Sequence, residues 1–357
     1  LKQSAAVKGK YFFVISPHEI WVTLAAIAEG ADQLLKQELF ELLSLPEDIC
    51  SRQKIYEIAT TRLNSNHYVN LIHNRALFID EAARVNPFWY NLVRQNSLLQ
   101  VIPVPLKYSP IITTEIIKQT IASKTQKLNL SGNSVIINSI DYDGLWTTGF
   151  GDTIVHRAPF YSPTGQQIGA VDLMKFRRKV RIGYVASINM KIIEIPIGLN
   201  KEYSMMFALV VDNDSSLAPS VSKWTNATAT EVFASLSDSY LPVDIAIPRF
   251  QISSEINVRE VLEELGVSSR LWSDPGATRY ISTPPARPSS YIQRATMTIS
   301  NRGINRPQYE FPSPPVNNDD RYWREFIADR PFVIGLFDSK TYASLMFTMY
   351  SEPTYPN

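Results

Sequence analysis

A dense run of basic residues lies in the middle of the chain, from Lys175 to Arg181. If this run forms a β-strand, alternate side chains point to the same face. The cations on that face are Lys175, Arg177, Lys179 and Arg181. Such a stripe can bind a polyanion, such as a sulfated glycosaminoglycan, or an acidic protein. It equally fits a solvated strand face whose charges discourage pairing with other chains, so both interpretations stay open.

Other residue types that carry chemistry are sparse. The histidines show no spacing typical of metal ligands. They are His18, His67, His73 and His156. Cys50 is the only cysteine, so no intrachain disulfide can form, and we expect a small apolar core residue there. Because a Gly-rich phosphate loop and a nucleophile elbow are also missing from the sequence, we expect no metal, no cofactor and no enzymatic activity.

Composition narrows the range of partners. The chain has 357 residues, 45% of them hydrophobic, and a formal net charge of +1. A chain of this length and composition can build a real core, and its bulk charge favours neither nucleic acid nor a membrane surface. No apolar run approaches the roughly 20 residues that a membrane-spanning helix needs. We expect a protein partner, with a polyanion as a further ligand that the basic run leaves open.

Three Asn-x-Ser/Thr triplets, the acceptors of N-linked glycans, begin at Asn129, Asn213 and Asn226. Asn213 and Asn226 lie in stretches rich in Asp, Ser and Thr, which are typical of exposed loops, and Asn129 follows a predicted helix that ends at Lys127. The sequence begins at Leu1 rather than Met, as it would after an N-terminal segment such as a signal peptide is removed. We therefore expect a secreted glycoprotein.

The elements that position these residues change in character near residue 130. Helical spacing of apolar residues predicts helices over 24–45, 49–63 and 113–127, and one that begins at Asn86-Pro87. Val, Ile, Phe and Tyr then predict strands at 135–137, 168–174, 176–198, 204–212, 243–252, 291–299 and 332–350, with one helix at 257–265. A helix-rich part over 1–130 and a sheet-rich part over 131–357 indicate an α+β fold. No linker divides them, so we expect a single domain over 1–357.

Short motifs recur along the chain in a definite order. They are Ser16-Pro17-His18-Glu19-Ile20, the stretch 74–79 with Val85-Asn86-Pro87, Ser123-Lys124-Thr125, Ile137-Asn138-Ser139-Ile140 with Gly144 and Trp146, Pro248-Arg249-Phe250, and Val261-Leu262 through Leu265-Gly266. The C-terminal end has an apolar strand over 326–334 that contains the motif Asp329-Arg330-Pro331-Phe332, then a turn at Asp338-Ser339-Lys340-Thr341 and an apolar stretch to Pro353. Together they resemble the serpins.

This resemblance implies three β-sheets, about eight or nine helices and an exposed reactive-centre-type loop, here at about 303–325. In inhibitory serpins a protease cleaves this loop and is trapped as an acyl-enzyme. The severed loop then inserts as a new central strand, which releases stored conformational energy.

Insertion makes demands on the hinge at the start of the loop, which in inhibitory members resembles Glu-Glu-Gly-Thr-Glu-Ala-Ala-Ala. The corresponding hinge here is Asn301, Arg302, Gly303, Ile304, Asn305, Arg306 and Pro307, followed by Gln308 and Tyr309. Gly303 fits this pattern, but Ile304 and the residues after Asn305 are bulky where small side chains are needed. Pro307 lacks the N–H that a central strand donates, as do Pro312, Pro314 and Pro315 further along.

Two further positions depart from the inhibitory pattern. Gln293 stands where the sheet-opening region usually has His, and Asn301 stands where a hinge Glu usually forms a buried ion pair.

The sequence therefore predicts a secreted, non-inhibitory serpin-like protein that acts as a binding or structural partner or as a carrier. The alternative is an extracellular inhibitor of serine or cysteine proteases with an atypical loop mechanism. Its scissile bond would lie near Asn317-Asn318, with Arg321 also within reach.

Overall fold

The computed structural model describes residues 12–61, 65–121, 128–150, 155–211, 217–224, 226–266, 269–305 and 324–354. Within these ranges the helices are α2 (Pro17–Ala28), α3 (Gln33–Leu43), α4 (Ile49–Thr61), α5 (Pro87–Gln95), α6 (Pro110–Ile121), α7 (Leu217–Ser222), α8 (Asn226–Ser235), α9 (Val258–Glu264) and α10 (Ser269–Ser273). A 3-10 turn, η2, covers Ala186–Ile188.

The strands of the first half are β1 (Phe13–Ile15), β2 (Val69–Asp80), β3 (Arg84–Val85), β4 (Gln100–Val104), β5 (Ser134–Gly144), β6 (Trp146–Thr148), β7 (Val155–Tyr161) and β8 (Gln167–Arg178). Those of the second half are β9 (Arg181–Val185), β10 (Met190–Ile197), β11 (Tyr203–Val210), β12 (Ser237–Asp238), β13 (Val243–Asn257), β14 (Ser282–Thr283), β15 (Pro288–Ile299), β16 (Gly303–Asn305), β17 (Glu325–Ile327), β18 (Phe332–Asp338) and β19 (Ser344–Tyr350).

These strands form three main sheets, which confirms the α+β class and the sheet number that the resemblance implies. The central sheet has the order β4-β2-β5-β15-β13. The long strand β13 continues into a small sheet of order β7-β8-β13-β17. The large sheet runs β1-β19-β18-β11-β10-β6-β16; β9 also pairs with β10, and β12 pairs with β9. A two-stranded ladder of β3 and β14 completes the pairing.

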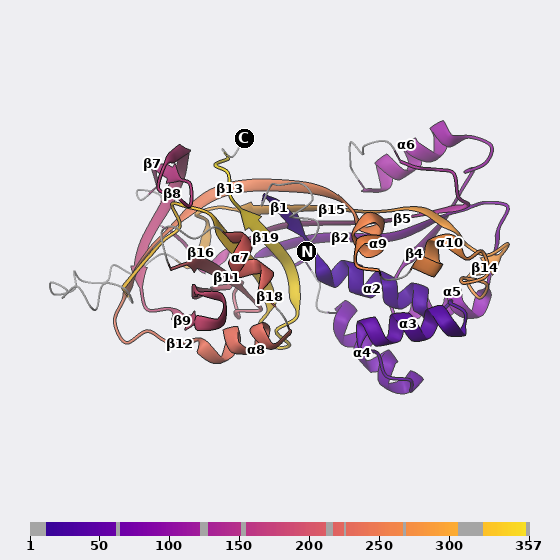
Figure 1. The fold of residues 1–357 in the computed structure, drawn as a ribbon, viewed down its shortest axis with the longest axis horizontal. Helices are drawn as coiled ribbons and strands as arrows, with labels where there is room; N and C mark the ends of the chain where they lie inside the picture. The colour runs from indigo at the N-terminus through magenta and orange to yellow at the C-terminus, as the bar shows by residue number, and fades with distance from the viewer. Residues whose placement is uncertain are drawn as a thin grey trace.

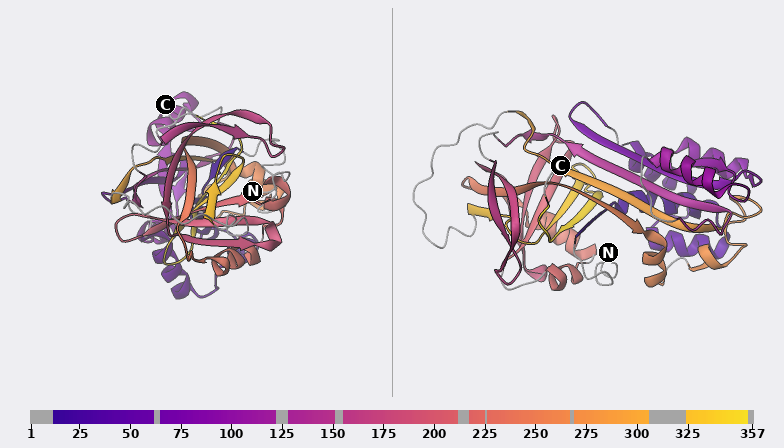
Figure 2. Two further views of the ribbon diagram at one scale, coloured as in Figure 1. Left: turned by 90° about the vertical axis from the view of Figure 1, so that its left-hand side faces the viewer. Right: turned by 90° about the horizontal axis from the view of Figure 1, so that it is seen from above.

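Helices cover the two faces of the central sheet unequally. In Figure 1, α2, α3 and α4 lie below the central sheet and α6 lies above it, and the view from above in Figure 2 shows helices over one end of the long strands. Ile117 of α6 is fully buried against Phe78 of β2 and against Val135 and Ile137 of β5. The central sheet is therefore closed in by apolar packing on both faces, which limits the side chains that a further strand could bring in.

The helices differ from the prediction in extent and in number. The single helix predicted over 24–45 is two helices, because the chain turns after Ala28 and Asp32 caps α3 by accepting a hydrogen bond from the Leu35 amide at 2.9 Å. The prediction of one helix in the sheet-rich part was wrong, since α7, α8 and α10 also lie there.

The prediction for Cys50 was also wrong: it is exposed on α4 rather than packed in the core. None of the helices in the described ranges has the length and apolar character required to cross a membrane.

Candidate functional site at the start of the exposed loop

The place where a further strand would enter the central sheet is the seam between β5 and β15. These strands are direct parallel neighbours, in register from Ser134 opposite Pro288 to Asp143 opposite Thr298, with one irregularity between Pro288 and Tyr291. Because their backbone groups bond to one another, any added strand must first break this ladder.

The start of the loop turns away from the seam. Gly303 pairs in parallel with Trp146, and Asn305 pairs with Thr148, so that β16 extends the large sheet at β6. The Trp146 amide donates to the Arg302 carbonyl at 3.2 Å, and the Gly149 amide donates to the Asn305 carbonyl at 3.0 Å. This short pairing holds the hinge as an edge strand beside β6.

Side chains reinforce this pairing just ahead of it. The Trp146 indole Nε1 donates to the Ser300 carbonyl at 2.6 Å, and the Asn305 Nδ2 donates to the Thr147 carbonyl at 2.9 Å. The Phe150 amide donates to the carbonyl of Asn301 at 3.0 Å. Asn301 therefore contributes its backbone to the hinge contacts.

Arg302 adds a charged contact. Its Nη2 lies 2.6 Å from each carboxylate oxygen of Asp143, at the end of β5. Both side chains are exposed, so solvent screening limits the stability that this ion pair contributes.

Gly303 is required by close packing rather than by a left-handed backbone. A Cβ atom at Gly303 would overlap the backbone of Gly149, and one at Gly149 would lie 2.7 Å from the Gly303 nitrogen. Two backbones can approach this closely only where both residues lack a side chain. We name the contacts of residues 300–305 with Asp143 and with residues 146–150 the hinge clasp.

At its other end the loop rejoins the fold at β17, which pairs in parallel with β13. The ammonium group of Lys191 donates to the Glu325 carbonyl at 2.7 Å. Burial lowers the pKa of Lys191 to about 8, although Glu325 opposes that shift. Both ends of the loop are therefore held by specific contacts.

Buried polar side chains tie the seam to α2. The Asn138 Nδ2 on β5 donates to the Tyr291 hydroxyl on β15 at 2.9 Å and to the Glu19 carbonyl at 3.0 Å. Thr23 donates to the Asn138 Oδ1 at 3.1 Å. Burial raises the pKa of Tyr291, so its phenol stays protonated across the physiological range. Asn138 thus bridges both sides of the seam.

Gln293, predicted as a departure from His, lies at the same level of the seam and is almost fully buried. Its Oε1 accepts from the Ser16 amide at 2.7 Å, and its Nε2 donates to the Ser16 carbonyl at 2.9 Å. An uncharged amide satisfies a buried donor and acceptor together, so this pairing holds at any pH.

Glu19 and Arg75 form a buried ion pair beside this network. Arg75 Nη1 lies 2.7 Å from Glu19 Oε1, and its remaining donors reach the Leu98 carbonyl at 2.9 Å and the Ser97 carbonyl at 2.9 Å. His73 Nδ1 lies 3.6 Å from the same carboxylate oxygen. Burial alone would raise the pKa of Glu19, but Arg75 and His73 more than offset it, so that pKa lies below its ordinary value. Burial also lowers the pKa of His18.

The comparisons with known proteins bear on this arrangement. The family described as "Serpin (serine protease inhibitor)" matches residues 1–353. The chain belongs to the serpin family. Among curated relatives, an uncharacterized serpin-like protein of Methanosarcina mazei is 23% identical and covers 98% of this chain and 84% of its own length.

Solved serpin structures share the fold. Manduca sexta serpin-12 is 20% identical with a TM-score of 0.81, covering 99% of this chain and 96% of its own. Native protease nexin-1, solved with heparin, is also 20% identical, with a TM-score of 0.83 and coverage of 98% and 95%. At this identity the likeness concerns the fold alone.

The predicted loop residues divide between two groups. Asn301, Arg302, Gly303, Ile304 and Asn305 lie in or next to β16. Arg306, Pro307, Asn317, Asn318 and Arg321 lie outside the described residues. The loop predicted over about 303–325 therefore begins within β16 and ends at β17 in this serpin.

The interpretation of the basic run as one strand was wrong. Lys175 and Arg177 lie on β8, but that strand ends at Arg178, and Arg181 begins β9. Arg177 forms an ion pair with Asp244, and Arg181 pairs with Glu194 at 2.5 Å. Lys175 and Lys179 are exposed. Two of the four cations are thus already matched by carboxylates, and polyanion binding remains a prediction.

The glycosylation triplets also differ in their settings. Asn129 is exposed, and its Oδ1 accepts from the Ser131 amide at 3.0 Å. Asn226 begins α8 rather than lying in a loop, which corrects the predicted setting. Asn213 lies outside the described residues. In the part of the chain that the structure describes, no three His, Cys, Asp or Glu side chains are grouped to hold a metal ion.

Sequence reasoning missed the partners of the hinge. Asp143, Trp146 and Gly149 lie more than 150 positions before the loop hinge, and nothing in their spacing indicates contact with it. The Gly149–Gly303 approach offers the best signal, because a glycine next to a strand often marks a close approach of two backbones.

Proposed function

We propose that this serpin does not trap proteases by inserting its loop, and that it acts outside the cell by binding a partner, as a carrier or as an extracellular ligand. The observation that carries this proposal is the hinge. Residues 301–305 are held in the hinge clasp beside β6, and the residues that follow in the sequence are bulky and include Pro307.

The energetic argument rests on what insertion would replace. It would break the β5–β15 ladder and the hinge clasp, and it would recover that loss only through new backbone bonds to both strands. Pro307 cannot donate one, and Ile304, Arg306 and Tyr309 would bring bulk into a sheet already covered by α6. The gain is too small to drive the transition.

The family description, a serine protease inhibitor, supports the second candidate: an inhibitor that blocks a protease with an uninserted loop. A screen of serine and cysteine proteases separates the two. We expect cleavage of the loop, shown by N-terminal sequencing of the new fragment, without any protease complex that survives a denaturing gel. A stable complex with any protease in the screen would overturn the proposal, whereas reversible inhibition without such a complex would favour the second candidate.

The extracellular setting is supported by the exposure of Asn129. We expect protein purified from its natural source to lose mass on treatment with an amidase that removes N-glycans. A variant with Asn129→Gln, expressed in the same cells, should lose the glycan carried at that site. An unchanged mass in the natural protein would argue against secretion.

Binding to a polyanion can be tested separately on a heparin column. If Lys175 and Lys179 bind sulfate groups, the wild-type protein should elute above physiological ionic strength, and the double variant Lys175→Ala/Lys179→Ala should elute earlier. Elution of both proteins together at physiological salt would leave the run as a solvated surface.

A further inference from the structure

A pocket of about 430 Å³ lies where β9, the end of α8 and β12 meet the residue just before β17. Its polar lining includes the hydroxyl-bearing residues Ser235, Ser237 and Ser239, and its charged lining residues are Asp238 and Arg324. The volume is within the range of about 300–1,000 Å³ that is typical of small-molecule sites. No feature of the hinge or the seam uses this pocket.

Arg324 is the residue that makes the pocket unusual. Its side chain is only 8% exposed. Across the described ranges, its guanidinium makes no hydrogen bond or ion pair. An arginine that is mostly buried and finds no acceptor among the described residues favours an opposite charge brought by a ligand. The chemistry of this side chain favours an anion in the pocket, and a carboxylate suits the fork of guanidinium donors best.

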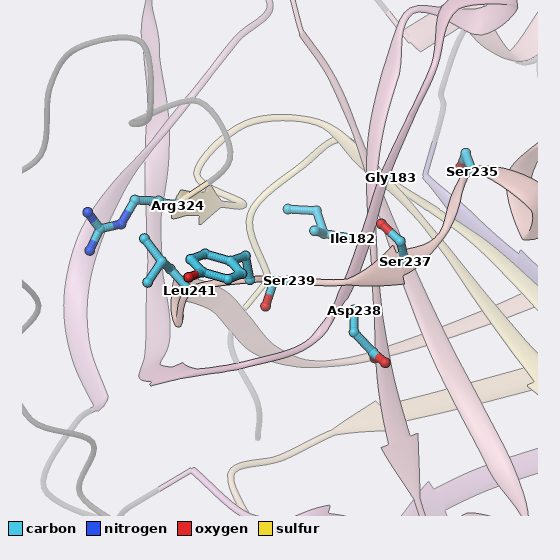
Figure 3. A pocket seen from close by; sticks show the side chains of 9 residues that line it. Ile182, Gly183, Ser235, Ser237, Asp238, Ser239, Leu241 and Arg324 are labelled. Carbon is cyan, nitrogen blue, oxygen red and sulfur yellow. The ribbon is translucent and has the colours of Figure 1, made fainter.

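Asp238 lies at another part of the same pocket. Figure 3 shows it well separated from Arg324, with Leu241 beside the arginine. Its register partner on β9 is Arg181, but that arginine is engaged by Glu194 at 2.5 Å. The exposed Asp238 carboxylate has no ion pair within the described residues. It can thus accept a hydrogen bond from a ligand.

Between these charges the pocket is apolar. Ile182 is buried, Leu241 is 36% exposed, and Tyr240 is among the most exposed aromatic side chains of the described chain. Gly183 packs so closely on Ser235 that a Cβ atom there would lie 2.5 Å from the serine Oγ, which keeps this side of the pocket free of side-chain bulk. An apolar ligand body would cover Tyr240 and Leu241 and remove their surface from water.

We propose that this pocket binds a small organic carboxylate: its carboxylate pairs with Arg324, its apolar body lies against Tyr240, Leu241 and Ile182, and a hydrogen-bond donor at its far end reaches Asp238. The proposal goes beyond the proposed function and holds whether or not the loop inserts.

Thermal melting and calorimetry with three related probes test it. The probes are 4-phenylbutanoate, its neutral amide, and 4-(4-aminophenyl)butanoate. We expect both acids to bind the full chain and raise its melting temperature, and the amide to bind about ten- to a hundredfold more weakly, because it loses a charged hydrogen bond. The aminophenyl acid should bind more tightly than the plain acid.

Variants assign each end of the ligand. Arg324→Gln should weaken binding of both acids by the same about ten- to a hundredfold, and Asp238→Ala should remove only the advantage of the aminophenyl acid. The matched control is Arg279→Gln, an exposed arginine that does not line the pocket, which should leave binding unchanged.

The ligand-free variants give a second readout. Because the Arg324 charge lacks a partner, Arg324→Met should keep or raise the melting temperature of the ligand-free protein. A marked fall would show that the arginine is structural and would overturn the proposal. Equal binding of acid and amide, or full binding to the Arg324→Gln variant, would overturn it as well.

Discussion

The seam and the segment that would enter it are built very differently. β5 and β15 pair in parallel along their length, with alternating apolar residues such as Ile136 and Ile140 packed in the core. That arrangement is a regular ladder, which an entering strand would have to open and pair with on both sides. The loop hinge, in contrast, offers only Gly303 before Ile304 and Pro307. The difference places the obstacle to insertion that we propose in the loop, while the sheet keeps the architecture of its family.

The largest expected effect comes from repairing the loop and leaving the seam alone. In a variant with Ile304→Thr, Arg306→Ala, Pro307→Ala, Gln308→Ala and Tyr309→Ala, cleavage of the loop should permit insertion. On the order of ten new backbone hydrogen bonds at about 1 kcal/mol each would raise the melting temperature of the cleaved protein by about 10–20 °C. Melting curves before and after cleavage measure this. If the repaired variant shows no rise, the seam itself is unable to accept a strand, and the comparison between loop and seam fails.

Breaking the seam's buried ion pair should have the next largest effect. Arg75→Ala leaves Glu19 as an uncompensated charge with no exposed surface, which costs about 3–5 kcal/mol in the free energy of unfolding. The double variant Glu19→Gln/Arg75→Met should recover most of that loss. Urea unfolding measures both, and a loss below about 1 kcal/mol for Arg75→Ala would show that the pair lies outside the stabilising part of the seam.

The same cluster predicts how stability depends on pH. The folded-state pKa of Glu19 is lowered by Arg75 and His73 against the effect of burial, so its contribution is present above about pH 4.5 and is lost below it. The folded-state pKa of His18 is also lowered, by burial, so folding is opposed once the unfolded chain takes up a proton below about pH 6.5.

Both groups act in one direction. The free energy of unfolding should fall as pH drops below 6.5, through His18, and should fall further below 4.5, through Glu19. Urea unfolding at several pH values measures this. His18→Gln should flatten the upper part of the curve, and an unchanged upper part would assign the pH dependence to other groups.

A smaller effect is expected in the hinge clasp. Gly303→Ala places a Cβ atom against the Gly149 backbone, so β16 must separate from β6, at a cost of about 1–3 kcal/mol. The amides of Trp146 and Gly149 should then exchange their hydrogens faster. Gly276→Ala is the matched control, since its Cβ would meet only Asp274 Oδ1 at 3.4 Å. If the Trp146 and Gly149 amides exchange at the same rate in both variants, the close approach of Gly303 to Gly149 does not stabilise the pairing of β16 with β6.

The smallest effect belongs to the exposed ion pair of Arg302 with Asp143. Arg302→Gln should lower the free energy of unfolding by only about 0.2–1 kcal/mol, and added salt should reduce the difference further. A denaturant series at low and high salt checks this. A salt-independent loss above that range would show that Arg302 has a role beyond this surface contact.

The loop and the seam also differ in how far the sequence predicts them. The sequence alone predicts that the hinge resists insertion, because Pro307 lacks a backbone N–H in any structure it adopts. The seam depends on pairings such as Glu19 with Arg75 and Ser16 with Gln293, whose members lie far apart in the chain, and no local pattern links them.

Local reasoning failed where tertiary context decides the structure. The sequence from Lys175 to Arg181 has the pattern of one strand, but β8 ends at Arg178. The residues from Arg181 form β9, which pairs with β10 in the large sheet, whereas β8 pairs with β7 and β13. Asp32 had the side chain to cap a helix, but the helical spacing on either side of it concealed the break.

Cleavage of the wild-type loop tests the central claim most directly. The protein is nicked within residues 306–323, the cut is confirmed by N-terminal sequencing, and melting curves are recorded before and after. If the loop does not insert, cleavage adds no backbone hydrogen bonds to the sheet, so the melting temperature should stay the same or fall slightly. A rise of more than roughly 10 °C would show that the loop enters the seam and would contradict the account.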